Sequence, residues 1–239
     1  MAAGSVDDVV KRERRWRPMD VIVVLAVLAS FAVGAHVLGF GPFANTGPSV
    51  ERADAAIELT DSAVEVEPSR PVEFAIPALG LRAGIDAEPC WLTDGALDPV
   101  NMDTACYYVA DDRPYSLPGS DAPDVSVLAG HAASGRAAVF DDLYDAAADT
   151  FTPEKGDELL VRTEAGGDEW LVYEAVDFHS MDKASLGGDE DVWGTGPVPG
   201  RMLTISCIQP RNPFSAATHN VIVGWEYAGV SDGPAATAA

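Results

Sequence analysis

The stretch LTISCIQPRNP, Leu203 to Pro213, is a short apolar run that ends on Cys207 and continues into a turn containing proline. Similar runs, among them VSVLAG, ELLVR, WLVYEAV and NVIVGWEY, recur between Phe74 and about Ala228, separated by turns rich in glycine and proline. Short runs with this punctuation are typical of strands in a mostly antiparallel sandwich or barrel. Only Arg136–Ala148 (RAAVFDDLYDAAA) has a brief helical pattern. The sequence therefore predicts an all-β domain with short helices.

The first forty residues predict a membrane anchor. Residues 21–40 contain no Asp, Glu, Lys or Arg, and about twenty helical residues span the roughly 30 Å of a hydrocarbon core. The tail of residues 1–20 carries five basic residues next to this span: Lys11, Arg12, Arg14, Arg15 and Arg17. Basic flanks remain in the cytoplasm, so we expect a single-pass cell-membrane protein whose main domain is extracellular. A cleaved signal peptide is the competing interpretation, but its apolar run is usually only ~7–15 residues, and no A-x-A-like site follows Phe40.

Three further segments follow the predicted anchor. Residues 41–72 are rich in Pro, Ala, Ser and acidic residues and show no sustained pattern, which predicts a flexible extracellular stalk. The β-rich domain is expected over 73–228, and residues 229–239 are expected to form a disordered tail. The chain carries a formal net charge of −23. Such an acidic surface argues against nucleic acid as a partner.

The cysteines and histidines limit the chemistry that is open to the domain. They form no cluster with metal-ligand spacing, and no nucleotide-binding glycine motif is present, so we expect no metal and no cofactor. The acidic run Asp189-Glu190-Asp191 offers oxygen ligands for calcium, but a solvated acidic loop explains it as well.

The three cysteines are expected to face an oxidising compartment, where disulfides persist. Cys90 and Cys106 bound a segment that reads as strand, turn and strand. A bridge between them would close a loop of about 17 residues and contribute roughly 3 kcal/mol; the alternative is that both remain reduced. Cys207 is then the odd cysteine, either a buried thiol or a reactive one.

A reactive thiol needs a base nearby, and His131 follows an apolar strand and precedes a loop of small residues. The motifs LAGH (128–131), ISC-x-x-P (205–210) and the closing strand NVIVG, in this order, resemble the sortases, cysteine transpeptidases of the Gram-positive surface. AVFDDL (138–143), the Lys-Gly-Asp turn and IPALGLRAGID (76–86) are most similar to actinobacterial class E/F sortases. The resemblance covers about residues 73–228.

The resemblance implies a closed eight-stranded β-barrel and an enzyme that cleaves an LPXTG-like sorting signal on secreted proteins. Cys207 would then be the nucleophile that forms a thioacyl-enzyme, and His131 the general acid and base. A peptidoglycan precursor or a pilin would supply the accepting amine. Thr204 and Ser206, on the strand that leads to the nucleophile, and Trp193, in the preceding loop, are expected to contact the substrate.

One position departs from the family. Sortases carry a catalytic arginine shortly before the last strand, where this chain has Thr218 and His219. Three possibilities stay open: Arg211, in the loop after Cys207, replaces it; His219 serves as the donor; or the site is weakened and the domain acts as an extracellular binding or assembly module. An L,D-transpeptidase is disfavoured, since ISCIQPR lacks the His and Gly that surround the cysteine of those enzymes.

Overall fold

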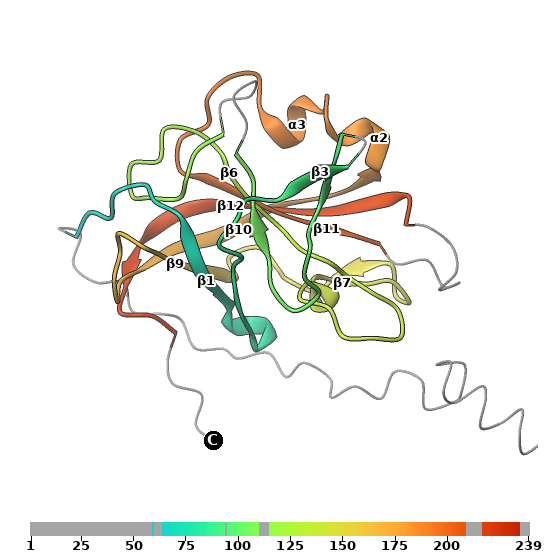
Figure 1. The fold of residues 1–239 in the computed structure, drawn as a ribbon, viewed down its shortest axis with the longest axis horizontal. Helices are drawn as coiled ribbons and strands as arrows, with labels where there is room; N and C mark the ends of the chain where they lie inside the picture. Colours follow the sequence, from blue (N-terminus) through green and yellow to red (C-terminus); the bar gives the residue numbers. More distant parts are fainter. Residues whose placement is uncertain (1–58, 60–63, 94, 110–114, 209–216, 235–239) are drawn as a thin grey trace, which may run out of the picture. The chain divides into compact units, whose positions relative to one another are not determined.

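The computed structural model describes residues 59, 64–93, 95–109, 115–208 and 217–234. Their central feature is one eight-stranded sheet in the order β2-β1-β9-β10-β12-β11-β6-β5 (Figure 1). Its strands are β1 (Pro71–Ile76), β2 (Leu81–Gly84), β5 (Cys106–Tyr107), β6 (Ser126–Ala129), β9 (Glu158–Thr163), β10 (Trp170–Asp182), β11 (Arg201–Cys207) and β12 (His219–Ser231). Neighbours are antiparallel except β6 and β11, which are parallel. The predicted all-β class is confirmed.

The sheet curls but is not closed by a strand ladder (Figure 1). Beside its edge strands β2 and β5, an isolated parallel bridge joins Ile85 to Ala105, and Cys90 N donates to Tyr107 O at 2.7 Å. The chain between these two residues leaves the sheet to form a small hairpin of β3 (Trp91–Thr93) and β4 (Ala96–Asp98). The eight strands of the expected barrel are therefore present, whereas a closed barrel is not shown.

The other short elements are η1 (Pro77–Leu79), η2 (Asp141–Leu143), the β7 (Tyr144–Asp145) and β8 (Thr150–Phe151) hairpin, α2 (Lys183–Leu186) and α3 (Glu190–Trp193). Within Arg136–Ala148 the predicted helical pattern is confirmed only as the 3-10 helix η2, which is followed by β7. The Asp141 carboxylate accepts hydrogen bonds from the backbone N–H groups of Ala133 and Ala138, both at 2.7 Å. Side-chain bonds of this kind satisfy the backbone in a loop and compete with helix formation.

Both faces of the sheet are covered, and this decides where the functional residues can lie. Along β11, Met202 belongs to the main core, whereas Leu203 and Ile205 belong to a second cluster on the opposite face. The second cluster also contains residues of the α2–α3 segment and of the β3 region, and Figure 1 shows these elements together on one side of the sheet. Because side chains alternate along a strand, Cys207 faces the side of Leu203 and Ile205.

The ordered domain extends beyond the predicted bounds at both ends. Residues 64–72, assigned by sequence to the stalk, pack on the domain: Val66 is 3% exposed, and Ser69 N donates to Pro118 O at 3.1 Å. At the other end β12 continues to Ser231, which is buried. The predicted tail 1–20 and anchor 21–40 lie outside the described residues, and within those residues no helix has the length and apolar character needed to cross a membrane.

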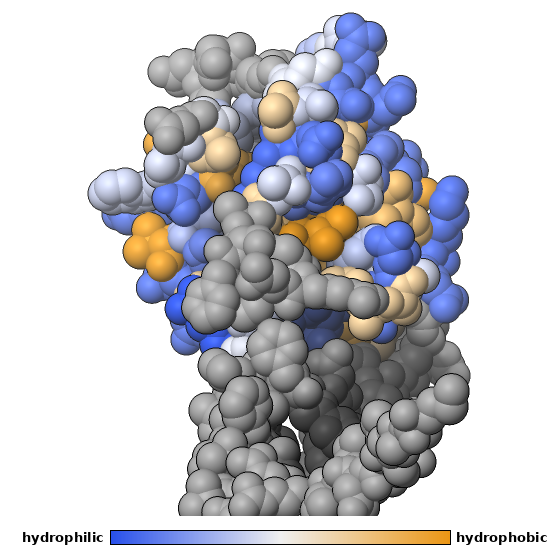
Figure 2. Space-filling model, turned by 90° about the vertical axis from the view of Figure 1, so that its right-hand side faces the viewer, coloured by the Kyte–Doolittle hydropathy of each residue, from blue (hydrophilic) through white to orange (hydrophobic). Residues whose placement is uncertain are grey.

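The surface of the described residues is mainly hydrophilic on the face in Figure 2, where hydrophobic residues form small separate groups. The most exposed large apolar side chains include two neighbours on β3, Trp91 and Leu92, with 68% and 53% exposure. Val100 and Val109, in the segments that follow β4 and β5, are also exposed. Exposed apolar residues therefore gather around the β3–β4 hairpin.

Candidate active site

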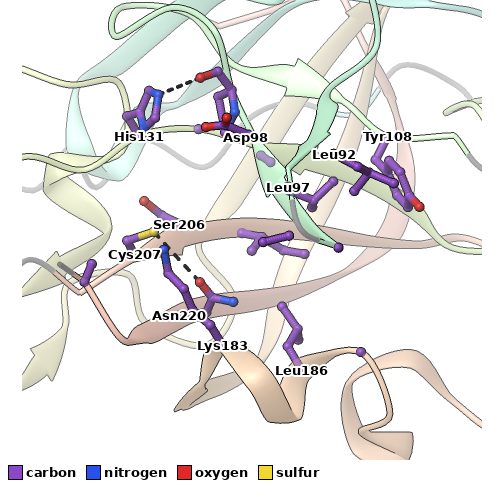
Figure 3. Close-up of a pocket in the computed structure, with 18 of the residues that line it drawn as sticks. Leu92, Leu97, Asp98, Tyr108, His131, Lys183, Leu186, Ser206, Cys207 and Asn220 are labelled. Carbon is purple, nitrogen blue, oxygen red and sulfur yellow. Dashed lines mark hydrogen bonds between the residues drawn. The ribbon is translucent and has the colours of Figure 1, made fainter.

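A cavity opens on the sheet face that carries the second cluster. Figure 3 shows Cys207, His131 and Asn220 toward one end of it and apolar side chains of the β3–β4 hairpin toward the other. Its apolar wall consists of Leu92, Leu97, Tyr108, Tyr115, Ala129, Leu186, Trp193 and Ile205. The cavity therefore combines a polar end with an extended apolar surface.

Strand register brings the polar residues into one row. In the parallel pair of β6 and β11, Ala129 lies opposite Ile205, and Gly130 N donates to Ile205 O at 3.1 Å. Two residues further along the two segments come His131 and Cys207, and both line the cavity. In the antiparallel pair of β11 and β12, Cys207 lies opposite Asn220. Neighbouring strands are about 4.8 Å apart. An imidazole, a thiol and an amide therefore share one end of the cavity.

Cys207 is the free thiol of the domain. Cys90 and Cys106, the pair expected from the sequence, form a disulfide, whereas Cys207 is free and half-buried. Its Sγ lies 3.9 Å from Oδ1 of Asn220, as a weak S–H donor facing a carbonyl acceptor (Figure 3). The thiol is therefore accessible from the cavity and already has a polar neighbour.

The ring of His131 is held in one tautomer. Its Nε2 lies 2.7 Å from the carbonyl oxygen of Pro99, just after β4 (Figure 3). Because a carbonyl oxygen only accepts, Nε2 carries a hydrogen, and in the neutral ring the lone pair is then on Nδ1. A neutral imidazole with a free lone pair is the form that can take a proton from a thiol.

The loop that carries His131 is fixed from two directions. Phe140 N donates to His131 O at 2.9 Å, and the Asp141 carboxylate binds the loop through the two N–H groups described above. Burial raises the pKa of Asp141, although the two N–H donors lower it. Gly130 precedes the histidine where no side chain fits, because a Cβ there would lie 2.6 Å from both Val139 and Phe140. The residues of the LAGH and AVFDDL motifs thus pack on one another and position His131.

The structure corrects the expectation for Thr204. It lies three positions before Cys207, so alternation places it on the opposite face of β11. It is fully buried, and its Oγ1 accepts a hydrogen bond of 3.0 Å from Nε1 of Trp225. Thr204 is a core residue and does not reach the cavity.

The remaining predicted residues have different positions. Ser206 is part of the cavity wall, but its buried hydroxyl has no partner among the described residues. Trp193 lines the cavity, with its ring 5.0 Å from that of Tyr115. His219 is not among the lining residues, and its Nε2 lies 3.4 Å from Asp182 Oδ1. These contacts support Trp193 as a wall residue and give His219 no role beside the thiol.

Two expectations concern other charged residues. Arg211 lies outside the described residues. Asp189 uses its carboxylate to accept hydrogen bonds from Asp191 N and Val192 N, which caps α3. In the part of the chain that the structure describes, no group of three or more His, Cys, Asp or Glu could hold a metal ion.

Asn220 is the site residue that sequence reasoning missed. A polar residue at the start of an apolar strand has no distinguishing signal, since strands commonly begin with such residues. Its position opposite Cys207 follows only from the pairing of β11 with β12.

Comparison with known proteins found matches among solved structures alone. No family model and no curated protein matches the chain. Sortase A from Corynebacterium diphtheriae is 16% identical, with 89% of this chain and 86% of that chain covered and a TM-score of 0.45. Sortase E1 from Streptomyces coelicolor with a tripeptide in the active site is 17% identical, with 70% and 93% covered and a TM-score of 0.44. Sortase C-1 from Actinomyces oris is 21% identical, with 66% and 72% covered and a TM-score of 0.42.

The structural neighbours thus include sortases A, C and E1.

Proposed function

We propose that this chain is a membrane-anchored cysteine transpeptidase of the sortase type, nearest to classes E and F in its motifs. The observation that carries the proposal is the parallel register of β6 and β11, which leads both His131 and the free Cys207 to the wall of a single cavity. A nucleophile, a base and an adjoining groove are the elements of acyl transfer.

The chemistry follows from these two side chains. The thiol passes its proton to Nδ1 of His131, and the sulfur attacks a peptide carbonyl carbon to form an S–C bond. When the tetrahedral intermediate collapses, the C–N bond breaks and the imidazolium protonates the leaving amine. An incoming amine then attacks the thioester, His131 takes its proton, and Cys207 is released as the thiol. Covalent catalysis thereby divides one difficult substitution into two easier steps.

The cavity favours a substrate with an apolar segment. Leu92 and Leu97 come from the hairpin, and Leu186 and Trp193 from the α2–α3 segment opposite. Apolar walls with a few polar groups at one end are typical of specific ligand sites. We propose an LPXTG-like sorting signal as the substrate and a cell-wall or pilin amine as the acceptor.

The location of the enzyme is part of the same proposal. Residues 21–40 would anchor the chain in the cell membrane, with the domain outside. The disulfide supports this orientation, because such bonds persist in oxidising compartments. Membrane fractionation followed by protease treatment of intact cells would test it: the domain should be digested from outside, and full protection would contradict the orientation.

The activity test uses the full chain in detergent micelles with internally quenched LPXTG and LAXTG peptides and a free amine. We expect cleavage and amine transfer, complete loss in Cys207→Ala, and a fall of about 10²–10⁴-fold in His131→Ala. Glu226→Gln, on an exposed position of β12, is the matched control and should keep full activity. Cleavage that survives Cys207→Ala would overturn the proposal.

A second function is favoured by one observation. Among the described residues that line the cavity there is one cation, Lys183, and no arginine with the forked donors that bind an oxyanion. A catalytically weak domain that binds sorting signals as an assembly module would have such a site. It would bind the peptide, yet form no thioacyl adduct that hydroxylamine can intercept.

A further inference from the structure

We propose that Asn220 is a catalytic residue that orients the thiol of Cys207 and donates a hydrogen bond to the oxyanion of the tetrahedral intermediate. This inference rests on the proposed function and names a neutral donor that lies opposite the nucleophile in the sheet.

The position of Asn220 supports this role. It lies opposite Cys207 in the β11–β12 ladder, lines the cavity and is 9% exposed. Its Oδ1 is the described atom that faces Sγ of Cys207, at 3.9 Å. Within the described residues, its Nδ2 makes no hydrogen bond to another group, so its two N–H donors remain available for a ligand in the cavity.

The neighbouring histidine does not compete for the role. His219 precedes Asn220 by one residue, and alternation along β12 directs its side chain to the other face. There it contacts Asp182, and its Nδ1 lies 3.0 Å from the hydroxyl of Thr218. Asn220 is therefore the polar side chain of β12 that reaches the thiol.

An amide suits both states of the reaction. In the resting enzyme the neutral S–H group donates to Oδ1. During attack, the S–C bond forms, the thiol proton resides on His131, and the carbonyl electron pair moves onto oxygen. That oxygen can then accept a hydrogen bond from Nδ2, which keeps its own proton throughout. Hydrogen-bond donors that are already held where charge develops lower the activation barrier most effectively. Burial in the β11–β12 ladder holds Asn220 in this way.

The test compares Asn220→Ala and Asn220→Asp with the wild-type full chain, with Glu226→Gln as the control on the same strand. The first measurement is the rate of Cys207 alkylation by iodoacetamide across pH 6–10, which needs no peptide substrate. Cys207 is the free thiol, because Cys90 and Cys106 are joined. Asn220→Asp should raise the apparent pKa of the thiol by about one to three pH units, because a carboxylate then faces the thiolate at about 4 Å.

The second measurement is peptide cleavage. Asn220→Ala should lower kcat by about 10²–10³-fold with little change in KM, as expected for loss of an oxyanion donor. Urea unfolding identifies any variant that loses its fold, and Asn220→Asp, which keeps the shape of the side chain, provides the alkylation result in that case.

The outcomes separate this inference from the proposed function. A wild-type chain that cleaves no peptide defeats the proposed function, while alkylation still decides whether Asn220 is coupled to the thiol. An unchanged alkylation profile in Asn220→Asp overturns the inference. So does Asn220→Ala with kcat within about threefold of wild type while cleavage still depends on Cys207.

Discussion

The disulfide between Cys90 and Cys106 closes the segment that contains the β3–β4 hairpin and Pro99, which contacts the ring of His131. The bond joins residues separated by 16 positions, and both cysteines are buried in the second cluster. The enclosed segment includes Pro99, whose carbonyl fixes the tautomer of His131. Loss of the bond should therefore reduce both stability and the order of the site.

The size of the stability effect follows from loop closure. Counting both cysteines, the separation of 16 gives a loop of 17 residues, for which the chain-entropy model predicts about 3 kcal/mol. In a domain of this size, each kcal/mol changes Tm by about 2–4 °C. We expect Cys90→Ala/Cys106→Ala to lower Tm by about 6–12 °C. Alanine is preferred to serine because both positions are buried, and a hydroxyl there would lack a partner.

The unfolding assay is carried out in a Cys207→Ala background, so that no thiol remains to exchange with the disulfide. The parent Cys207→Ala protein, measured with and without reductant, is the control, and reductant should reproduce the effect of the double substitution. A Tm within about 2 °C of the parent would refute the reasoning, since loop closure would then contribute little.

The same substitution has a second readout in the protein with Cys207 intact. If the hairpin positions His131, kcat should fall by about tenfold or more while the unfolding transition remains cooperative, because a 1 Å displacement of a catalytic group is costly. Unchanged kcat in a destabilised protein would show that Pro99 holds its position without the disulfide.

Three further changes probe the loop, the core and an ion pair. Asp141→Asn leaves one acceptor for the two loop N–H groups, so we expect a loss of about 1–2 kcal/mol in urea unfolding together with about tenfold lower kcat; wild-type kcat would contradict its positioning role. Thr204→Val leaves Trp225 Nε1 without an acceptor and should cost about 1–3 kcal/mol with KM unchanged, whereas a raised KM would restore Thr204 to the substrate site. Burial opposes ionisation of Asp177, but its hydrogen bonds and charge interaction with Arg201 outweigh this and lower its pKa. Its contribution to stability is therefore complete above the unfolded pKa of about 3.9 and is lost as the pH falls through the lower folded pKa; Asp177→Asn should flatten urea stability between about pH 2 and 5, and parallel curves would disprove the assignment.

The fold class was predictable because it depends on local patterns. Short apolar runs with Gly and Pro turns specify strands one at a time, and the strands carrying His131 and Cys207 were both recognised in this way. Whether the sheet closes into a barrel was not predictable. It depends on how residues near Ile85 and Ala105 pair, and the β3–β4 hairpin lies between them in the sequence. The helical pattern around Asp141 gave only the short η2 for another reason: its carboxylate satisfies loop N–H groups that a longer helix would have paired.

His131 and Cys207 were predictable because each lies at the end of a recognisable apolar strand. A residue whose role depends on pairing between strands was not predictable. Asn220 acquires meaning only from the β11–β12 register, in which a slip of one residue would exchange it for His219 or Val221 opposite Cys207. Gly224 helps to fix that register, since a Cβ there would overlap Asp177 Oδ1 and approach Arg201. The residues before and after Gly224 carry side chains, so neither could occupy its position beside the ion pair of Asp177 and Arg201. The position of Asn220 opposite Cys207 thus depends on strand pairing that involves a glycine four residues further along the same strand, which no local motif around Cys207 records.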